Sequence, residues 1–404
     1  MPENFLPFSP PLLGDEEIAE VVDTLRSDWI TTGPKVKRFE EEFAAALGAP
    51  AALALSSCTA GLHVALATLG IGRGDAVIAT PMTFCSAVHV IEQVGARPLL
   101  VDVEPDTLNI DPIKVRETLR QVSNEAALGK VKAILPVHLY GHPCDMDSLL
   151  EIAREHDLAI IEDAAHALPA KYKGRWVGSG GAAKIPLLTS FSFYATKNLT
   201  TGEGGMLTGP PGLVEEARVW SLHGMNRDAW KRYTAEGSWY YEVIRPGFKY
   251  NMTDIQAAIG LHQLRKLSRF HARRTEIVRR YNAAFAGLAE VQTPTARPEV
   301  EHAWHLYVLR LNPERFNLSR GRFIQELTAR NIGSSVHFIP IHIHPYYRDK
   351  YGYEPESFPV AYHAYQNIVS LPLSPRMEDR DVDRVIEAVC DIIAKRKAGL
   401  CPVA

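Results

Sequence analysis

Short apolar runs alternate with amphipathic stretches from residue 50 onward, and this alternation constrains the fold more than any other feature of the chain. Proline, glycine or acidic turn residues bound the apolar runs, which are the expected strands 51–55, 75–80, 97–101, 131–136, 158–161 and 190–193. Between the first two runs, Thr59–Leu69 reads as a helix. Strands that alternate with helices predict an α/β fold, in which helices cover a largely parallel sheet.

The second part of the chain has a different character. Apolar side chains recur at helical spacing from Asp254 to Phe285, which predicts one long helix with its N-cap at Thr253 or Asp254. A chain of 404 residues exceeds the roughly 250–300 that one hydrophobic core supports. We therefore expect a large domain over 1–253, whose N-terminal segment is free to pack on a smaller second domain over 254–404. The smaller domain is expected to contain strands at 304–311 and 334–338 and helices at 321–330 and 379–397.

Charge and hydropathy exclude several classes of partner. The chain has 44 Lys and Arg against 47 Asp and Glu, a net charge of −3, which lacks the positive excess typical of nucleic-acid binding. No apolar run approaches the ~20 residues of a membrane span, and the first residues show no export signal. We expect a cytoplasmic protein that binds neither nucleic acid nor membrane.

Cysteine and histidine usage argues against metal. The five cysteines include no Cys-x-x-Cys pair and are odd in number, so neither a disulfide framework nor a zinc site is expected. His337, His342 and His344 cluster in one stretch, and on a strand His342 and His344 would share a face. Because no Asp, Glu or Cys lies close by, we expect substrate contact or packing here rather than a metal site.

An acidic residue ends one of the expected strands. Asp163 follows the apolar run 158–161, and in a parallel sheet this position lies at the carboxyl edge, where α/β proteins bind ligands. An equally weighted alternative is a carboxylate that caps the following helix.

A lysine follows another strand. Lys197 comes after the hydroxyl-rich and aromatic run Ser190–Phe193 and precedes a Gly-rich stretch at 201–208. An arbitrary lysine is a surface residue, but a buried lysine can lose its proton near neutral pH and act as a nucleophile. Ser192 is placed to hold a phosphate close to that amine.

Two further elements suit a phosphorylated ring. The small-residue turn Ser56–Gly61 leads from a strand into a helix, whose first N–H groups bind phosphate, with a hydroxyl from Thr59. An ordinary helix cap is as frequent for such a turn. Phe84 offers a flat aromatic at the same edge, although a core phenylalanine is the commoner role.

Together these elements supply a phosphate cradle, a stacking aromatic, a strand-end carboxylate and a lysine. Pyridoxal phosphate requires this set, because the carboxylate keeps the pyridine nitrogen protonated and the lysine binds the cofactor covalently.

In these elements the chain resembles the DegT/DnrJ/StrS family of nucleotide-sugar aminotransferases. That family belongs to the aspartate-aminotransferase-like, fold type I pyridoxal phosphate enzymes. Beyond the elements above, the resemblance includes Trp29–Glu40, Gly247–Ala258 and Ser370–Pro375, and so extends nearly end to end. It implies a large domain with a mostly parallel mixed sheet sandwiched by helices, and a smaller C-terminal α/β domain.

The resemblance also implies roles for single residues. Lys197 matches the catalytic Schiff-base lysine, and Asp163 matches the partner of the pyridine nitrogen. His166 stands where many relatives carry a Gln that contacts the ring hydroxyl. The phosphate-binding and ring-stacking positions of the family are matched by Cys58, Thr59, Ser192 and Phe84. Cys58 replaces a common Gly, so only its backbone N–H is expected to matter.

The segment Gly247–Asp254 resembles a loop that reaches into the neighbouring subunit's active site, which implies a homodimer with shared sites. Many relatives read Gly-x-Asn-Tyr-Arg here, whereas this chain has Lys249 and Asn251, so the contact to the partner's phosphate is assigned to Asn251. The substrate sugar is expected near Thr31, Gly33, His337 and His342.

The implied reaction moves an amino group from an amino acid, L-glutamate, to the keto carbon of a nucleotide-linked keto-deoxy sugar, for cell-surface polysaccharide or other glycoconjugate synthesis. The Lys249 and Asn251 variant and the segment His223–Trp230 favour C4 of a UDP-linked 4-keto-6-deoxyhexose over C3 of a dTDP- or UDP-linked 3-keto sugar.

Three rivals fit less well. A sugar 3-dehydratase of this type carries His in place of the lysine. A pyridoxal lyase or desulfurase needs a separate mobile-loop Cys. A non-catalytic sugar-binding or regulatory protein has no use for the intact lysine, carboxylate and phosphate cradle.

Overall fold

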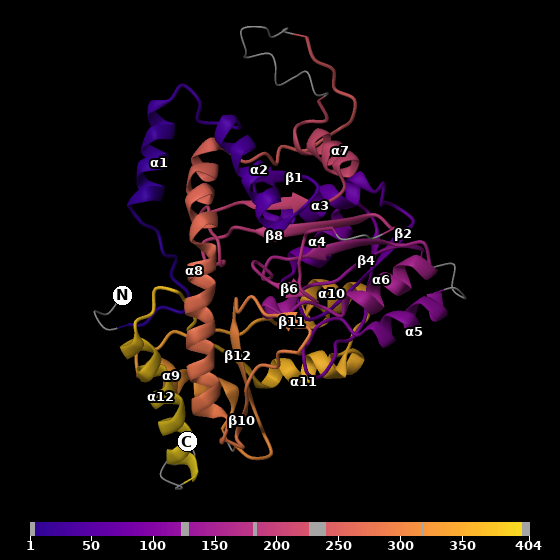
Figure 1. Ribbon diagram of the computed structural model, residues 1–404. Helices are drawn as coiled ribbons and strands as arrows, with labels where there is room; N and C mark the ends of the chain where they lie inside the picture. The colour runs from indigo at the N-terminus through magenta and orange to yellow at the C-terminus, as the bar shows by residue number, and fades with distance from the viewer. Residues whose placement is uncertain (1–4, 123–128, 181–183, 226–239, 317, 398–404) are drawn as a thin grey trace.

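A seven-stranded sheet forms the centre of the computed structural model, which describes residues 5–122, 129–180, 184–225, 240–316 and 318–397 (Figure 1). Its strands lie in the order β1 (Ala52–Leu55), β9 (Gly205–Thr208), β8 (Leu187–Ser192), β5 (Ala159–Asp163), β4 (Lys130–Leu135), β2 (Asp75–Ala79) and β3 (Arg97–Leu100). All neighbours from β8 to β3 pair in parallel, and β9 is antiparallel to both β8 and β1. The predicted mostly parallel sheet is therefore confirmed.

Helices cover both faces of this sheet. One face packs on α3 (Cys58–Thr68), α4 (Ser86–Gln93) and α7 (Pro211–Ser221). The opposite face packs on α2 (Pro34–Leu47), α5 (Pro112–Val122), α6 (Met146–Glu155) and the first part of α8 (Asp254–Phe285). Because both faces are covered, the inner strands are buried at nearly every position, and their apolar stretches appear in the sequence as continuous runs rather than as an alternating pattern.

The long helix α8 begins where the sequence predicts. Thr253 is its N-cap, and the Thr253 hydroxyl and the Gln256 side chain form a reciprocal capping box. The next residue, Asp254, is buried and accepts hydrogen bonds from the backbone N–H groups of Gly33 (2.9 Å), Lys35 (3.1 Å) and Val36 (2.9 Å). One carboxylate thus caps the start of α2 and fixes it to the start of α8.

A second core forms around the C-terminal half of α8. It contains an antiparallel sheet of β10 (Val291–Gln292), β12 (Tyr307–Leu311) and β13 (Ile368–Leu371), together with α9 (Arg320–Ala329) and α12 (Asp379–Lys397). In contrast, the elements from 341 to 367 adjoin the core of the first sheet. They are η4 (Ile341–Ile343), α10 (Pro345–Tyr351), the short η5 (Pro355–Ser357) and α11 (Pro359–Asn367). These elements follow residue 254 in the chain but pack on the first core. The division of the chain into two domains at residue 254 therefore remains a proposal.

The N-terminal segment lies along the second core. Leu6 pairs in parallel with Ile332 and is buried among that core, whereas α1 (Asp15–Arg26) lies beside the first half of α8 (Figure 1). Two minor elements complete the fold: η2 (Leu139–Gly141), and a small sheet of β11 (Val300–Glu301), β6 (Lys171–Tyr172) and β7 (Arg175–Trp176).

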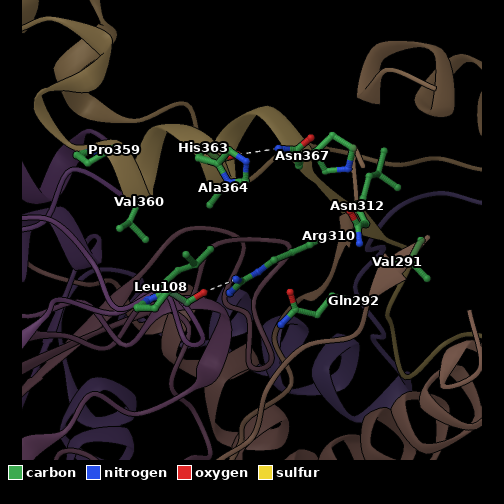
Figure 2. A pocket seen from close by; sticks show the side chains of 13 residues that line it. Leu108, Val291, Gln292, Arg310, Asn312, Pro359, Val360, His363, Ala364 and Asn367 are labelled. Atoms are coloured by element: carbon green, nitrogen blue, oxygen red, sulfur yellow. Dashed lines mark hydrogen bonds between the residues drawn. The ribbon is translucent and has the colours of Figure 1, made fainter. Parts of the chain in front are cut away.

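A cavity of about 480 Å³ lies where β10, β12 and α11 meet the loop at 105–108 (Figure 2). Arg310 of β12 reaches from the second core to the loop at 105–108, where its guanidinium donates to the carbonyls of Pro105 and Asp106. The residues that line the cavity include none of those predicted for the cofactor site, so the cavity lies outside that site.

Two local predictions are wrong. Residues 334–338 form no strand; Ser335 makes only an isolated bridge to Ser370. His342 and His344 do not share a strand face either, since residues 341–343 form the 3₁₀ turn η4 and Pro345 starts α10 directly after it. Among the described residues, no helix has the length and apolar character needed to cross a membrane.

Candidate active site

The predicted site residues gather at the carboxyl edge of the first sheet. Asp163 ends β5, Ser192 ends β8, and α3 begins three residues after β1 ends. Lys197 follows β8 in a turn in which its backbone N–H donates to the Tyr194 carbonyl (2.9 Å). Neighbouring parallel strands end at one edge, so this topology brings together residues that lie more than a hundred positions apart in the sequence.

The start of α3 has the features of a phosphate cradle. Ser57 is the N-cap, and its side chain accepts the N–H of Ala60 (3.0 Å). Within the described chain, the N–H groups of Cys58 and Thr59 donate to no protein acceptor, as expected for the first turn of a helix. The turn therefore has an ordinary helix cap and still presents free N–H donors. The two interpretations of the sequence, a helix cap and a phosphate-binding turn, are compatible.

Glycine is required where β9 passes this turn. A Cβ atom at Gly205 would lie 2.4 Å from the carbonyl carbon of Ser57 and 2.6 Å from the Cys58 nitrogen. The Gly-rich stretch after Lys197 thus allows the backbone of β9 to approach the cradle closely.

Asp163 is a buried carboxylate with one oxygen left over. Its Oδ1 accepts the N–H of Ala165 (3.0 Å) and lies 3.7 Å from the Cys58 thiol, whereas no described residue donates to Oδ2. Burial raises the pKa of Asp163, and the Ala165 N–H and the Lys197 charge oppose that rise. A cation that donates a hydrogen bond, such as a protonated pyridine nitrogen, would compensate this carboxylate.

The side chain of Cys58 contributes more than the sequence suggested. Its Sγ lies 3.4 Å from the Ser190 carbonyl as well as close to Asp163. Burial raises the pKa of this thiol well above its ordinary value, so Cys58 stays protonated and is able to act as a weak donor.

The amine of Lys197 has a strongly lowered pKa. Burial lowers its pKa from 10.5 to about 8, although the negative charge of Asp163 acts in the opposite direction. The amine is thus poised to lose its proton near neutral pH, which a lysine that bonds covalently to a carbonyl requires.

His166 is buried beside this lysine. Its Nδ1 accepts the backbone N–H of Tyr140 (3.2 Å), and its ring centroid lies 4.4 Å from that of His305 and 5.7 Å from that of Phe338. Burial, with the Lys197 charge, lowers the pKa of His166 well below its ordinary value, so the ring is neutral.

Phe84 lies at the mouth of the site. It is 58% exposed, which makes the core interpretation wrong, and its ring centroid is 5.9 Å from that of Phe338, the ring that stacks on His166. A flat aromatic at this place is available to stack on a bound ring.

Thr31, Gly33 and Asn251 form a second group beside the sheet edge. Thr31 accepts the Asp254 N–H (2.9 Å) through its carbonyl, while the Asn251 amide donates to Thr32 (2.6 Å) and accepts from Lys249. The chain next to Asn251 borders the cradle, because the Ser56 N–H donates to the Tyr250 carbonyl (2.7 Å).

The two predicted substrate histidines are in different environments. His337 lies close to Lys197, and burial together with the Lys197 charge lowers the pKa of His337 to about 4. His342 is fully buried; its Nε2 lies 2.9 Å from the Pro355 carbonyl, and its ring packs on Phe358. The substrate role predicted for His342 is therefore corrected to packing, the alternative that the sequence had left open.

Sequence reasoning missed three residues that surround the site. Tyr140, Asn198 and His305 are buried and hydrogen-bonded around His166 and Lys197. Only the position of Asn198, directly after Lys197, was visible as a signal. In the described part of the chain, no group of three or more His, Cys, Asp or Glu is arranged to hold a metal ion.

Comparisons with known proteins agree with this geometry. The model of the DegT/DnrJ/EryC1/StrS aminotransferase family matches residues 11–390. The spore coat polysaccharide biosynthesis protein SpsC of Bacillus subtilis is 51% identical over 392 residues, which cover 96% of this chain and 97% of SpsC. An uncharacterized protein of Methanocaldococcus jannaschii is 50% identical over 396 residues, covering 98% and 99% of the two chains.

A solved structure matches the whole architecture. Spr1654 of Streptococcus pneumoniae, described as a sugar aminotransferase and solved in a PMP form, has a TM-score of 0.86 and 37% identity, covering 96% of this chain and 99% of its own. Its PLP form matches with the same TM-score. These likenesses confirm the expected fold type I architecture. The chain therefore belongs to the DegT/DnrJ/EryC1/StrS family of aminotransferases, enzymes that use pyridoxal phosphate.

Proposed function

We propose that this sugar aminotransferase moves an amino group from L-glutamate to C4 of a UDP-linked 4-keto-6-deoxyhexose. The observation that carries the amine-transfer chemistry is the Lys197 amine: burial lowers its pKa to about 8, although the nearby Asp163 carboxylate acts in the opposite direction. With that pKa, about one lysine in ten is uncharged at pH 7. The likeness to SpsC, a protein of polysaccharide biosynthesis, supports a sugar as the acceptor.

The residues of the site fit pyridoxal phosphate, which when bound supplies an electron sink for the reacting carbon. Lys197 would hold the cofactor through Nζ and move protons at that atom. Asp163 would keep the pyridine nitrogen protonated through its free Oδ2, and His166 would contact the ring hydroxyl. The phosphate would be held by the N–H groups of Cys58 and Thr59 and by the Thr59 and Ser192 hydroxyls. Phe84 would stack on the ring.

The choice of C4 rests on the Gly247 loop. Lys249 donates to Asn251, and Asn251 in turn donates to Thr32, so the Lys and Asn variant links this loop to the expected sugar site at 31–33. Residues 226–230 of the other supporting segment, His223–Trp230, lie outside the described residues. Amination at C3 of a 3-keto sugar is the second candidate.

A substrate panel tests this proposal. The loaded enzyme is incubated with glutamate and UDP-, dTDP- and GDP-linked 4-keto and 3-keto sugars, and NMR identifies the aminated carbon. We expect turnover with the UDP-linked 4-keto-6-deoxy sugar; amination only of the 3-keto compounds would refute the C4 assignment. The donor is tested separately, since glutamate and not alanine should convert the loaded enzyme to its amine form in the absence of sugar.

We further infer a homodimer in which Asn251 completes the partner's phosphate site. In the single chain the Asn251 side chain contacts Lys249 and Thr32, with no hydrogen bond to Cys58, Thr59 or Ser192. Mixing the Lys197→Ala and Asn251→Ala variants tests this inference. With shared sites, each mixed dimer holds one intact site, so a 1:1 mixture should regain about a quarter of wild-type activity. If each chain uses its own Asn251, mixing should restore nothing.

We also propose a cytoplasmic location. The four described cysteines, Cys58, Cys85, Cys144 and Cys390, are free thiols, which supports a reducing compartment. Fractionation of the producing cells, with the chain detected by antibody, tests it; recovery from the extracellular or membrane fraction would contradict it.

A further inference from the structure

The side-chain amide of Asn198, the residue after Lys197, has a fixed orientation. Its Nδ2 donates to the carbonyls of Leu168 (2.9 Å) and Ala303 (2.8 Å), and its Oδ1 faces Nδ1 of His305 (3.2 Å). Backbone carbonyls only accept, so the NH₂ group must point at them and the amide oxygen must point at His305. Asn198 is buried, and in this orientation both its amide nitrogen and its amide oxygen have hydrogen-bond partners.

This orientation decides the tautomer of His305. An amide oxygen only accepts, so Nδ1 of His305 must carry the proton, and its Nε2 is then unprotonated in the neutral ring. His305 is 3% exposed, and burial lowers its pKa well below the ordinary value, which keeps the ring neutral.

His166 is fixed as the opposite tautomer. Its Nδ1 accepts the Tyr140 N–H, so the proton of the neutral ring must lie on Nε2. Tyr140 can donate in this direction because its backbone is in the left-handed region, with φ of 60°, which is uncommon for a residue other than glycine.

His305 also holds Tyr140 in this conformation. The backbone N–H groups of His305 (3.1 Å) and Leu306 (3.2 Å) both donate to the Tyr140 carbonyl. The buried Arg274 of α8 secures this segment in turn, because its Nη1 donates to the carbonyls of Trp304 (3.3 Å), His305 (3.3 Å) and Leu373 (2.9 Å). A hydrogen-bonded path therefore runs from the residue next to Lys197, through His305 and Tyr140, to His166.

We propose that Asn198 and His305 are positioning residues, which hold His166 as a neutral Nε2–H donor toward the cofactor ring and couple it to the Lys197 turn. This inference rests on the proposed cofactor contact of His166. It explains how a histidine serves at a position where many relatives carry glutamine: with Nδ1 occupied by Tyr140, the ring presents one N–H donor, as a glutamine amide does. A cationic imidazole is disfavoured there, because it would need a proton on Nδ1, and Nδ1 cannot carry a proton while it accepts the Tyr140 N–H.

The tautomers are tested first, on the full chain without cofactor. Histidine labelled with ¹⁵N in the ring is incorporated, and long-range proton–nitrogen spectra at pH 7 show which ring nitrogen of each histidine carries the proton. The His166→Gln and His305→Asn variants assign the signals. We expect the proton on Nδ1 of His305 and on Nε2 of His166; the other tautomer at either residue, or a doubly protonated ring, would overturn the proposal.

The coupling to Lys197 is tested on the loaded enzyme in the absence of any substrate. Asn198→Asp replaces the donor NH₂ with a carboxylate oxygen that faces two carbonyls, next to the cofactor lysine. Its control is Asn367→Asp, which removes a single amide bond to the His363 carbonyl at the end of α11. We expect Asn198→Asp to weaken pyridoxal phosphate binding about tenfold and to raise the pH midpoint of the visible cofactor band, while Asn367→Asp changes neither. Unchanged affinity and midpoint in Asn198→Asp would refute the positioning role.

A rescue pair separates positioning from general damage to the fold. His305→Asn retains a side-chain N–H at the Nδ1 position and should stay near wild type in cofactor affinity, whereas His305→Leu removes the donor and should behave as Asn198→Asp does. Equal losses in both variants would contradict the role of that donor. Neither readout involves a sugar or an amino acid, so a failure of the proposed transfer reaction would leave these results unaffected.

Discussion

The half-buried, neutral His337 predicts a measurable loss of stability in mild acid. Burial and the Lys197 charge lower the pKa of His337 from 6.5 to about 4, while its Nδ1 pairs with the Ser370 hydroxyl (2.8 Å) and its ring stacks on Phe8. The unfolded chain takes up this proton near pH 6.5, and the folded chain does so only near pH 4. In that window the unfolded state binds more protons, so stability is complete above pH 6.5 and falls as the pH is lowered.

The size of the effect follows from the shift. Each pH unit in the window is worth about 1.4 kcal/mol for one proton, so His337 alone accounts for roughly 3 kcal/mol between pH 6.5 and 4. Between pH 7 and 5 the expected contribution is about 2 kcal/mol. Replacing the histidine with glutamine removes the titrating group, and the free energy of unfolding of the variant should depend less steeply on pH by nearly one proton.

The assay is urea unfolding of the cofactor-free protein at pH 7 and at pH 5, at equal chain concentration and ionic strength. The wild-type advantage over His337→Gln should shrink by about 2 kcal/mol between the two pH values. The matched control is His156→Gln, an exposed histidine at the end of α6, which should follow the wild-type pH dependence. Parallel pH dependences for wild type and His337→Gln would refute the reasoning.

Further predictions concern the supports of the site. Asp254→Ala should cost about 2–5 kcal/mol in urea unfolding, because three backbone N–H groups at the start of α2 lose their acceptor, whereas loss of the single cap bond in Ser319→Ala should cost about 1 kcal/mol. A similar cost for the two variants would contradict this. Gly205→Ala should weaken pyridoxal phosphate binding at least about tenfold, since the new methyl group would strike the Ser57–Cys58 backbone. Gly212→Ala in α7, where a Cβ meets nothing within 4 Å, should leave binding unchanged, and a wild-type affinity in Gly205→Ala would show that the cradle tolerates displacement.

The sequence identified the first sheet well because burial on both faces makes its strands continuous apolar runs. The long helix was equally legible, since Thr253 and Gln256 form a capping box that local sequence specifies. The stretch 334–338 misled because Val336 and Phe338 alternate with polar residues as in a strand, whereas only Ser335 has a bridge partner, Ser370. Pro340 and Pro345 flank a single 3₁₀ turn there, and the chain continues as helix.

The site was predicted only as far as strand ends and helix starts reveal it. Asp163, Ser192 and Lys197 follow strands of one sheet, so topology alone brings them to one edge. The network of Tyr140, Asn198 and His305 leaves no such trace, because its members are joined by single hydrogen bonds between loops more than fifty residues apart. The sequence likewise could not show that the Cys58 thiol approaches Asp163, since that contact depends on how α3 abuts β5 and β8.

The most direct test of the central claim is to identify the residue that binds the cofactor. The protein is loaded with pyridoxal phosphate and reduced with borohydride, and the modified peptide is located by mass spectrometry. We predict a single reduced adduct on Lys197, and none in the Lys197→Ala variant, which should keep its fold. An adduct on another lysine, such as Lys249, or a protein that forms no adduct, would contradict the assignment of this edge of the sheet as the active site.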